Sequence, residues 1–216
     1  MINEDNQLCF SQLESLPNSF ISSSILLLNK IYEKCLSGGY GFDSAYEIAE
    51  THQNFFKNHD NALNILIKQE SKKAALGAVF TGLGGVISLP ITIPANLIST
   101  LFIQMRLVTA IAILQGYDVK EEKIKVLVYI SLCVMPGKQK MWKTFVNLIH
   151  KSNQEVIKKI SLNINNILIS IMNLKHGTKI IRLFPFIGSV TGGVIDGLMT
   201  YQIGQFAKRQ FSQLAS

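Results

Sequence analysis

The chain of 216 residues is poor in cysteine, proline and charge. Three cysteines do not form a closed set of disulfides, which excludes a small disulfide-stapled secreted domain. Only 16% of the residues are charged, against about 25% in an ordinary soluble domain, and 48% are hydrophobic. This balance excludes an intrinsically disordered chain and indicates a protein that buries a large apolar surface.

Signals for export, lipid attachment and familiar chemistry are also missing. The N-terminus is acidic and has no apolar core of a secretory signal, and no myristoylation or prenylation motif is present, which predicts a cytoplasmic protein. The sequence has no HExxH, CxxC, Walker A, GxGxxG or GxSxG motif. We therefore predict no cofactor, no metal and no catalytic residue of a recognised type.

Hydrophobic residues recur with helical spacing along nearly the whole chain, and no stretch shows the sustained alternation of a strand. We therefore predict an all-α, single-domain bundle of about seven helices. Capping and turn residues set the expected boundaries. The first helix closes at Gly38–Gly41, Ser44 and Glu47 form a capping box, Asp60 caps a third helix that ends near Leu89, Gly116 ends the fourth, a fifth covers about 119–135, and the last runs from about Phe186 to Phe211.

Residues 74–105 contain no Lys, Arg, Asp or Glu, which raises the question of a membrane span. Pro90 and Pro94 interrupt this run, and the piece before them would reach only about 24 Å as a helix, short of a ~30 Å hydrocarbon core. Arg106 lies in the middle of the second piece, where a charge is costly. A membrane span, a re-entrant or surface-inserted hairpin and a buried hairpin all stay open.

Small residues spaced four apart accompany these apolar segments and let helix backbones approach closely. We predict that four of them pack helices together: Gly84, Gly85, Gly192 and Gly193. The alternative is that the glycines clear room for an acyl chain or another slender ligand.

Charge is divided unevenly along the chain. Residues 1–70 contain nine acids and four bases, whereas residues 71–216 contain five acids and seventeen bases. The predicted basic surface comprises Lys138, Lys140, Lys143, Lys158 and Lys159. Aliphatic side chains separate these lysines and few aromatic rings are available to stack on bases, so the pattern favours an anionic membrane surface over nucleic acid.

Polar side chains inside the apolar segments need partners, because burying them unpaired costs several kcal/mol. Asn96, Gln104 and Arg106 lie in one such helix, and Asp196 is the only acid in the run 183–207. We predict that Asp196 lies near Arg106 or near a polar group of the same hairpin. The interpretations are a buried structural pair, a pocket for a ligand headgroup, or a catalytic site.

His52 with Glu47, Glu50 and Asp43 is a second candidate, as a metal or acid–base cluster. Acids near a helix N-terminus more often interact with the helix dipole.

Three segments resemble the EcsC protein family: TGLGGVISLPITIPANLISTLFIQMRLVTAIAILQGYD at 81–118, GFDSAYEIAE at 41–50 and FPFIGSVTGGVIDGLMTYQIGQFAKRQF at 184–211. The resemblance implies a bacterial helical protein of a family named after a gene that neighbours an ABC transporter. It implies a single domain over 1–216, with a helical extension at 1–40 and the family-like core at 41–216. The signature residues that it implies are Gly84, Gly85, Pro90, Pro94, Asn96, Gln104, Arg106 and Asp118.

From these patterns we expect a non-catalytic binding protein, peripherally associated with anionic lipid. Its lysines would dock on the lipid, and an apolar turn of Leu89, Pro90, Ile91, Ile93 and Pro94 would enter the interface. The alternatives are a lipid-modifying or hydrolytic enzyme with a nonstandard polar site, and an accessory subunit of a membrane transporter such as an ABC transporter.

Overall fold

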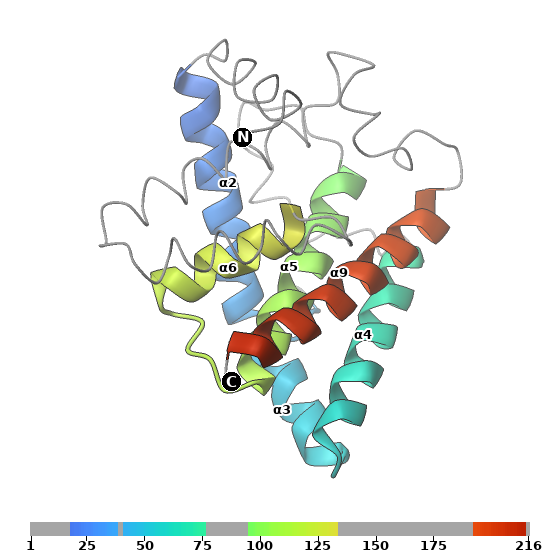
Figure 1. Cartoon of the computed structure of the whole chain (residues 1–216). Helices are drawn as coiled ribbons and strands as arrows, with labels where there is room; N and C mark the ends of the chain where they lie inside the picture. Colours follow the sequence, from blue (N-terminus) through green and yellow to red (C-terminus); the bar gives the residue numbers. More distant parts are fainter. Residues whose placement is uncertain (1–17, 39–40, 77–94, 134–191, 215–216) are drawn as a thin grey trace, which may run out of the picture.

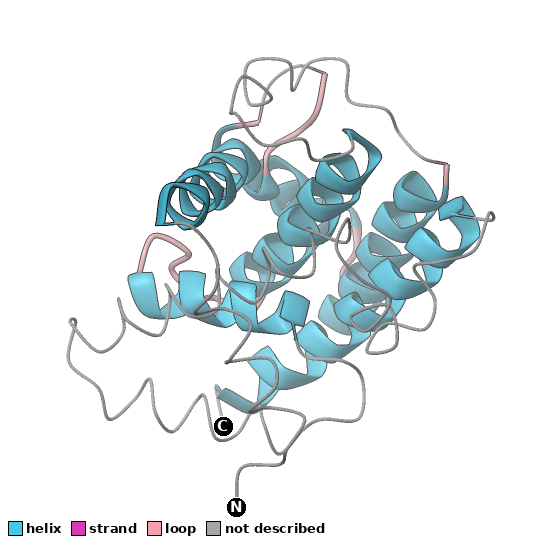
Figure 2. Ribbon diagram, turned by 90° about the horizontal axis from the view of Figure 1, so that it is seen from above, coloured by secondary structure: helices cyan, strands magenta, loops and turns pink. Residues whose placement is uncertain are grey.

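A computed structural model describes residues 18–38, 41–76, 95–133 and 192–214, and these ranges form helices and no strand (Figures 1 and 2). The helices are α2 (Asn18–Ser37), α3 (Ala45–Phe55), α4 (His59–Ala75), α5 (Ala95–Leu114), α6 (Glu122–Cys133) and α9 (Gly192–Leu214). The all-α prediction is confirmed, with six helices in the described ranges where about seven were expected for the chain.

Local capping chemistry sets two of the helix starts. The predicted capping box is present before α3, where Glu47 N donates to Ser44 Oγ over 3.1 Å and Ser44 N donates to Glu47 Oε2 over 2.6 Å. The prediction that Asp60 caps α4 is wrong. Asn58 is the cap and its side chain accepts from Asn61 N, because Asn58 has the extended backbone of a cap whereas Asp60 lies in the first helical turn.

The predicted third helix is also too long, because α4 ends at Ala75 and not near Leu89. The last turn of α4 contains Lys72 and Lys73, whose charges favour a helix C-terminus. The apolar run beyond Lys73 suggested a continuous helix, but hydrophobicity alone does not mark where a helix stops. The described part of the last helix starts at Gly192, and its predicted start near Phe186 lies outside the described residues.

Two glycines with positive φ end helices where the sequence predicted ends. Gly38 has φ 67° after α2, and a Cβ added there would lie 2.9 Å from Ser44 N. Gly116 has φ 85° after α5, and its backbone N donates to Ile113 O over 2.9 Å. L-residues rarely adopt this conformation, so glycine allows both chain reversals.

Helix α5 is the centre of the bundle and contacts each of the other five described helices (Figure 1). Every residue from Met105 to Ala112 is buried, which explains why α5 shows no polar face. No helix within the described ranges is both long enough and apolar enough to cross a membrane.

Helices α4, α5 and α9 are packed side by side in a fixed register. Thr100 of α5 bonds Asp196 of α9 near their N-terminal ends, and Gln115 bonds Lys208 O near their C-terminal ends, so these two helices run parallel. Helix α4 runs antiparallel to α9, since Gly197 packs on Ala75 whereas Lys208 bonds Asn64. The C-terminal end of α4 therefore meets the N-terminal halves of α5 and α9 at one end of the bundle.

Candidate functional site

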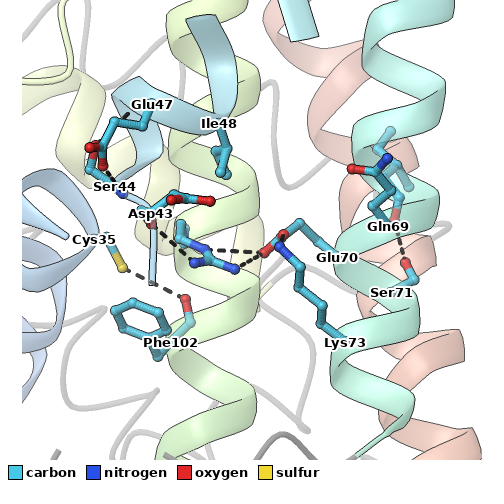
Figure 3. A network of polar contacts seen from close by, with 12 residues as sticks. Cys35, Asp43, Ser44, Glu47, Ile48, Gln69, Glu70, Ser71, Lys73 and Phe102 are labelled. Atoms are coloured by element: carbon cyan, nitrogen blue, oxygen red, sulfur yellow. Dashed lines mark hydrogen bonds and ion pairs between the residues drawn. The ribbon is translucent and has the colours of Figure 1, made fainter. Parts of the chain in front are cut away.

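The predicted polar residue Arg106 lies at the middle of α5 and is fully buried. Its Nε and Nη2 donate to Glu70 Oε2 of α4 over 3.1 and 2.5 Å. Its Nη1 donates to the backbone oxygen of Asp43, which precedes α3, over 3.0 Å. Figure 3 shows Asp43 and Glu70 pointing toward each other from opposite sides of α5. One guanidinium therefore joins three parts of the bundle.

The second carboxylate oxygen of Glu70 and the faces of the Arg106 guanidinium also have partners. Glu70 is 1% exposed, and its second oxygen accepts from Lys73 Nζ over 2.7 Å. The rings of Phe42 and Phe102 lie 5.5 and 5.3 Å from the Arg106 guanidinium carbon, a distance suited to cation–π contact. We call Arg106, Glu70, Asp43 and Lys73 the Arg106 centre. The charges of Arg106, Glu70 and Lys73 are paired and hydrogen-bonded, as a buried structural ion pair requires, and Asp43 contributes its backbone oxygen.

Glu70 is the ion-pair partner of Arg106, and the sequence interpretation missed it. A usable signal was present, because Glu70 follows Leu66 and Ile67 at i+4 and i+3 on the apolar stripe of α4. An acid on the buried face of an amphipathic helix needs a cation. Asp196 was expected near Arg106 or near a polar group of the same hairpin, and it contacts the hydroxyl of Thr100 in α5.

Asp196 lies against other polar groups of α5. Its carboxylate accepts from Thr100 Oγ1 over 3.2 Å, and its backbone oxygen accepts from Thr200 Oγ1 over 2.7 Å. Gln104, a predicted site residue, donates to the same Thr200 hydroxyl over 3.3 Å. Burial raises the pKa of the Asp196 carboxyl above its usual value, opposed by the Thr100 hydrogen bond. A polar strip between α5 and α9 therefore includes a carboxylate that is unfavourable in its ionised form.

We expect Asp196→Asn to stabilise the fold at neutral pH and to have less effect in acid. The folded-state pKa of Asp196 is raised, so its stability contribution is fully present below the unfolded value of 3.8 and is lost as pH rises through the folded value. Asparagine keeps an acceptor for Thr100 without the charge. Thermal unfolding of both proteins from about pH 2 to pH 8 should show a difference in Tm that grows with pH.

Asp60→Asn is the control of opposite sign. The hydrogen bond from Lys208 holds the pKa of the Asp60 carboxyl below its usual value. Its stability contribution is present above the unfolded value of 3.8 and is lost as pH falls, so this variant should be less stable near neutral pH and converge with the unmodified chain in acid. A pH-independent Tm difference for Asp196→Asn would contradict the burial argument.

The other predicted site residues are dispersed. Asp118 is exposed and accepts from Lys120 N over 2.9 Å in the turn before α6, away from the Arg106 centre. Asn96, Gly192 and Gly193 lie in the first turns of α5 and α9. The remaining predicted residues lie outside the described ranges: Gly84, Gly85, Leu89, Pro90, Ile91, Ile93, Pro94, Lys138, Lys140, Lys143, Lys158 and Lys159.

The alternative cluster around His52 does not converge. His52 is buried, with Nδ1 2.6 Å from Ile48 O and Nε2 3.0 Å from Gln69 Oε1. Glu47 instead serves the capping box of Ser44. Within the part of the chain that the structure describes, no group of three His, Cys, Asp or Glu side chains is arranged to hold a metal ion.

Helices α4 and α9 pack closely at Gly197 and Gly204, which are not among the four glycines predicted to pack helices together. A Cβ added at Gly197 would lie 2.7 Å from Ala75 Cβ and 3.0 Å from Ser71 O. A Cβ added at Gly204 would lie 2.9 Å from Ile67 Cγ1. Helices α4 and α9 therefore approach closely because α9 has no side chain at these positions.

Comparison with known proteins identifies the family. The sequence model of the EcsC protein family matches residues 7–213. This match includes the three resembling segments and the basic stretch between them. No curated protein and no solved structure matches the chain. Because the family match covers nearly its whole length, the chain belongs to the EcsC protein family.

Proposed function

We propose that this chain is a membrane-associated, non-catalytic binding protein that docks on anionic lipid. The observation that carries the proposal is the meeting of three helix ends at one end of the bundle, where Gly197 packs on Ala75 and Thr100 bonds Asp196. The chain leaves α4 at this end for residues 77–94, and it enters α9 here from residues 134–191.

The composition of these two connecting stretches supports lipid as the partner. Residues 77–94 contain no charged side chain, and residues 134–191 contain nine bases and one acid. Each lysine near an anionic leaflet contributes about 1 kcal/mol to binding, so four engaged lysines hold a protein at the surface. An apolar stretch and a strongly basic stretch that join one end of a bundle suit the boundary between headgroups and acyl chains.

The Arg106 centre supports a role without catalysis. Arg106 and Glu70 are 0% and 1% exposed, and each is paired inside the packed core. A catalytic group needs access to its substrate, whereas these groups hold α4, α5 and the start of α3 together. Arg106, one of the polar residues that first suggested an enzyme, thus has a role in holding the helices together.

The test is flotation of the purified full chain with vesicles of phosphatidylcholine alone or mixed with phosphatidylglycerol, across a salt series. We expect binding to the anionic vesicles and loss of binding near ~0.5 M salt, where the Debye length is only a few ångströms. Flotation with both vesicle types at every salt concentration would contradict electrostatic docking. Absence of flotation would overturn the proposal and favour a protein partner such as a transporter.

Ile91→Asp combined with Ile93→Asp tests the apolar turn. We expect the double variant to be released from anionic vesicles with its helical circular dichroism unchanged, because two buried charges oppose insertion. Asn54→Asp with Phe55→Asp is the matched control, since it adds two charges at exposed positions near the end of α3. Unchanged flotation of the Ile91 and Ile93 variant would count against the turn.

A further inference from the structure

We propose a second, helical contact with anionic lipid on the outer face of the α4–α9 pair, an inference that rests on the proposed function. We call it the α4–α9 face and define it by Lys68, Lys72, Leu76, Leu198 and Tyr201. It was not among the predicted basic or apolar residues. Its position follows from the described helices alone.

Lys68 and Lys72 of α4 form one line with Leu76, the residue that caps the C-terminal end of α4. Lys68, Lys72 and Leu76 follow one another at intervals of four, and all three are exposed. Glu70 points the other way, toward Arg106 of α5. The line therefore lies on the side of α4 that faces away from the centre of the bundle.

Helix α9 continues the same outer side. Asp196 and Thr200 face α5 through their bonds to Thr100 and Gln104, whereas Leu198 and Tyr201 are exposed. Gly197 of α9 packs against Ala75 of α4. Leu198 directly follows Gly197 in sequence, and Leu76 directly follows Ala75. Figure 1 shows α9 and α4 crossing closely at this end.

The exposed apolar side chains of this face are large. Leu76 is 84% exposed and Leu198 is 60% exposed, while Tyr201 adds a ring with a polar tip. Lysine stems cover apolar surface while their ammonium groups reach headgroups, and tyrosine suits the same boundary. Leu76 lies next to the charge-free stretch 77–94 in sequence, and Lys72 and Lys68 lie one and two turns earlier in α4. In a membrane contact the leucines would reach the acyl chains and the lysines would reach the headgroups.

The charge of the face matches an anionic partner. From residue 61 to residue 76 the sequence has a single acid, Glu70, which is buried and paired, and Asp60 in the first turn of α4 pairs with Lys208. The single acid of α9 is Asp196, which bonds α5. No carboxylate of these two segments therefore lies beside Lys68 and Lys72. Aliphatic leucines do not stack on bases, so the face favours lipid over nucleic acid.

Vesicle affinity of the full chain tests the two lysines. We expect Lys68→Gln with Lys72→Gln to weaken binding to vesicles containing phosphatidylglycerol roughly 30-fold, the effect of losing two lysines near the surface. Lys57→Gln with Lys120→Gln is the matched control: both residues are exposed, they lie in the turns before α4 and α6, and the net charge changes equally. The control should change affinity less than about threefold, since these lysines lie away from the contact.

A second pair tests the apolar tip. Leu76→Ser with Leu198→Ser should weaken binding about tenfold through lost apolar burial, and Leu26→Ser with Phe55→Ser should leave it nearly unchanged. The control residues are 46% and 78% exposed, so both pairs replace surface side chains. Circular dichroism and thermal unfolding should be the same for all four variants.

The outcomes separate this inference from the proposed function. If the unmodified chain binds anionic vesicles and the variant with Ile91→Asp and Ile93→Asp is released, unchanged affinity of both the Lys68 and the Lys57 pairs would overturn the α4–α9 face and leave lipid docking intact. Equal weakening by both lysine pairs would mean a diffuse effect of net charge and would also overturn it. Failure of the unmodified chain to bind any vesicle would overturn the proposed function and this inference together.

Discussion

Arg106→Met is expected to lower the free energy of unfolding by about 3–5 kcal/mol, the usual effect of removing one partner of a buried ion pair. The reason is Glu70, which is 1% exposed and would keep only Lys73 as a charged partner. The backbone oxygen of Asp43 would also lose its donor. Since small domains are stable by about 5–15 kcal/mol, this substitution removes a large part of the total. Urea unfolding followed by circular dichroism is the measurement.

Two further variants identify the origin of that loss. Lys73→Gln removes the other, 41% exposed, partner of Glu70 and should cost less than about 1 kcal/mol, as surface pairs do. Arg106→Met with Glu70→Leu removes both buried charges and should recover much of the stability. A double variant no more stable than Arg106→Met would show that the loss came from packing around Phe42 and Phe102 and not from an uncompensated charge.

Gly197→Leu should lower the free energy of unfolding by about 3 kcal/mol, because it inserts a side chain where α4 and α9 touch. A Cβ at this position already comes within 2.7 Å of Ala75 Cβ and 3.0 Å of Ser71 O, which belongs to the backbone. The helices would have to separate along a line that also includes Gly204 and Ile67. The better helix propensity of leucine recovers only about 1 kcal/mol.

Gln202→Leu is the matched control for Gly197→Leu, because it introduces the same residue at an exposed position of α9. Its effect should stay within about 0.5 kcal/mol. Urea unfolding of the two variants under identical conditions gives the comparison. Equal stabilities would mean that α4 and α9 separate without cost and that the close approach does not specify the bundle.

Features set by neighbouring residues were predicted well. The capping box of Ser44 and Glu47 and the helix ends at Gly38 and Gly116 depend on interactions within a few residues of the chain. Asp60 shows where this fails, since Asn58 and Asp60 are both good caps and lie two residues apart. The backbone path decides between them, and composition does not.

Partners that are distant in sequence were predicted only in part: Asp196 was expected near a polar group of the hairpin, whereas the pairing of Arg106 with Glu70 was not expected. Arg106 and Glu70 are 36 residues apart, and Thr100 and Asp196 are 96 apart. Arg106 in the apolar helix α5 needs an anionic partner, but the sequence alone does not show which of several carboxylates is that partner. Which of them pairs with Arg106 depends on the register in which α4, α5 and α9 dock.

The sequence by itself determined the helical class, the family and the need for buried polar groups to be paired, because periodicity, local motifs and the cost of desolvation all act through residue type and short spacing. The tertiary structure decided that Glu70 pairs with Arg106, that Gly197 lies against Ala75, and that Lys68, Lys72, Leu76, Leu198 and Tyr201 stay exposed. These depend on how whole helices cross and slide against one another. That geometry arises from packing many side chains at once, so no single stretch of sequence contains it.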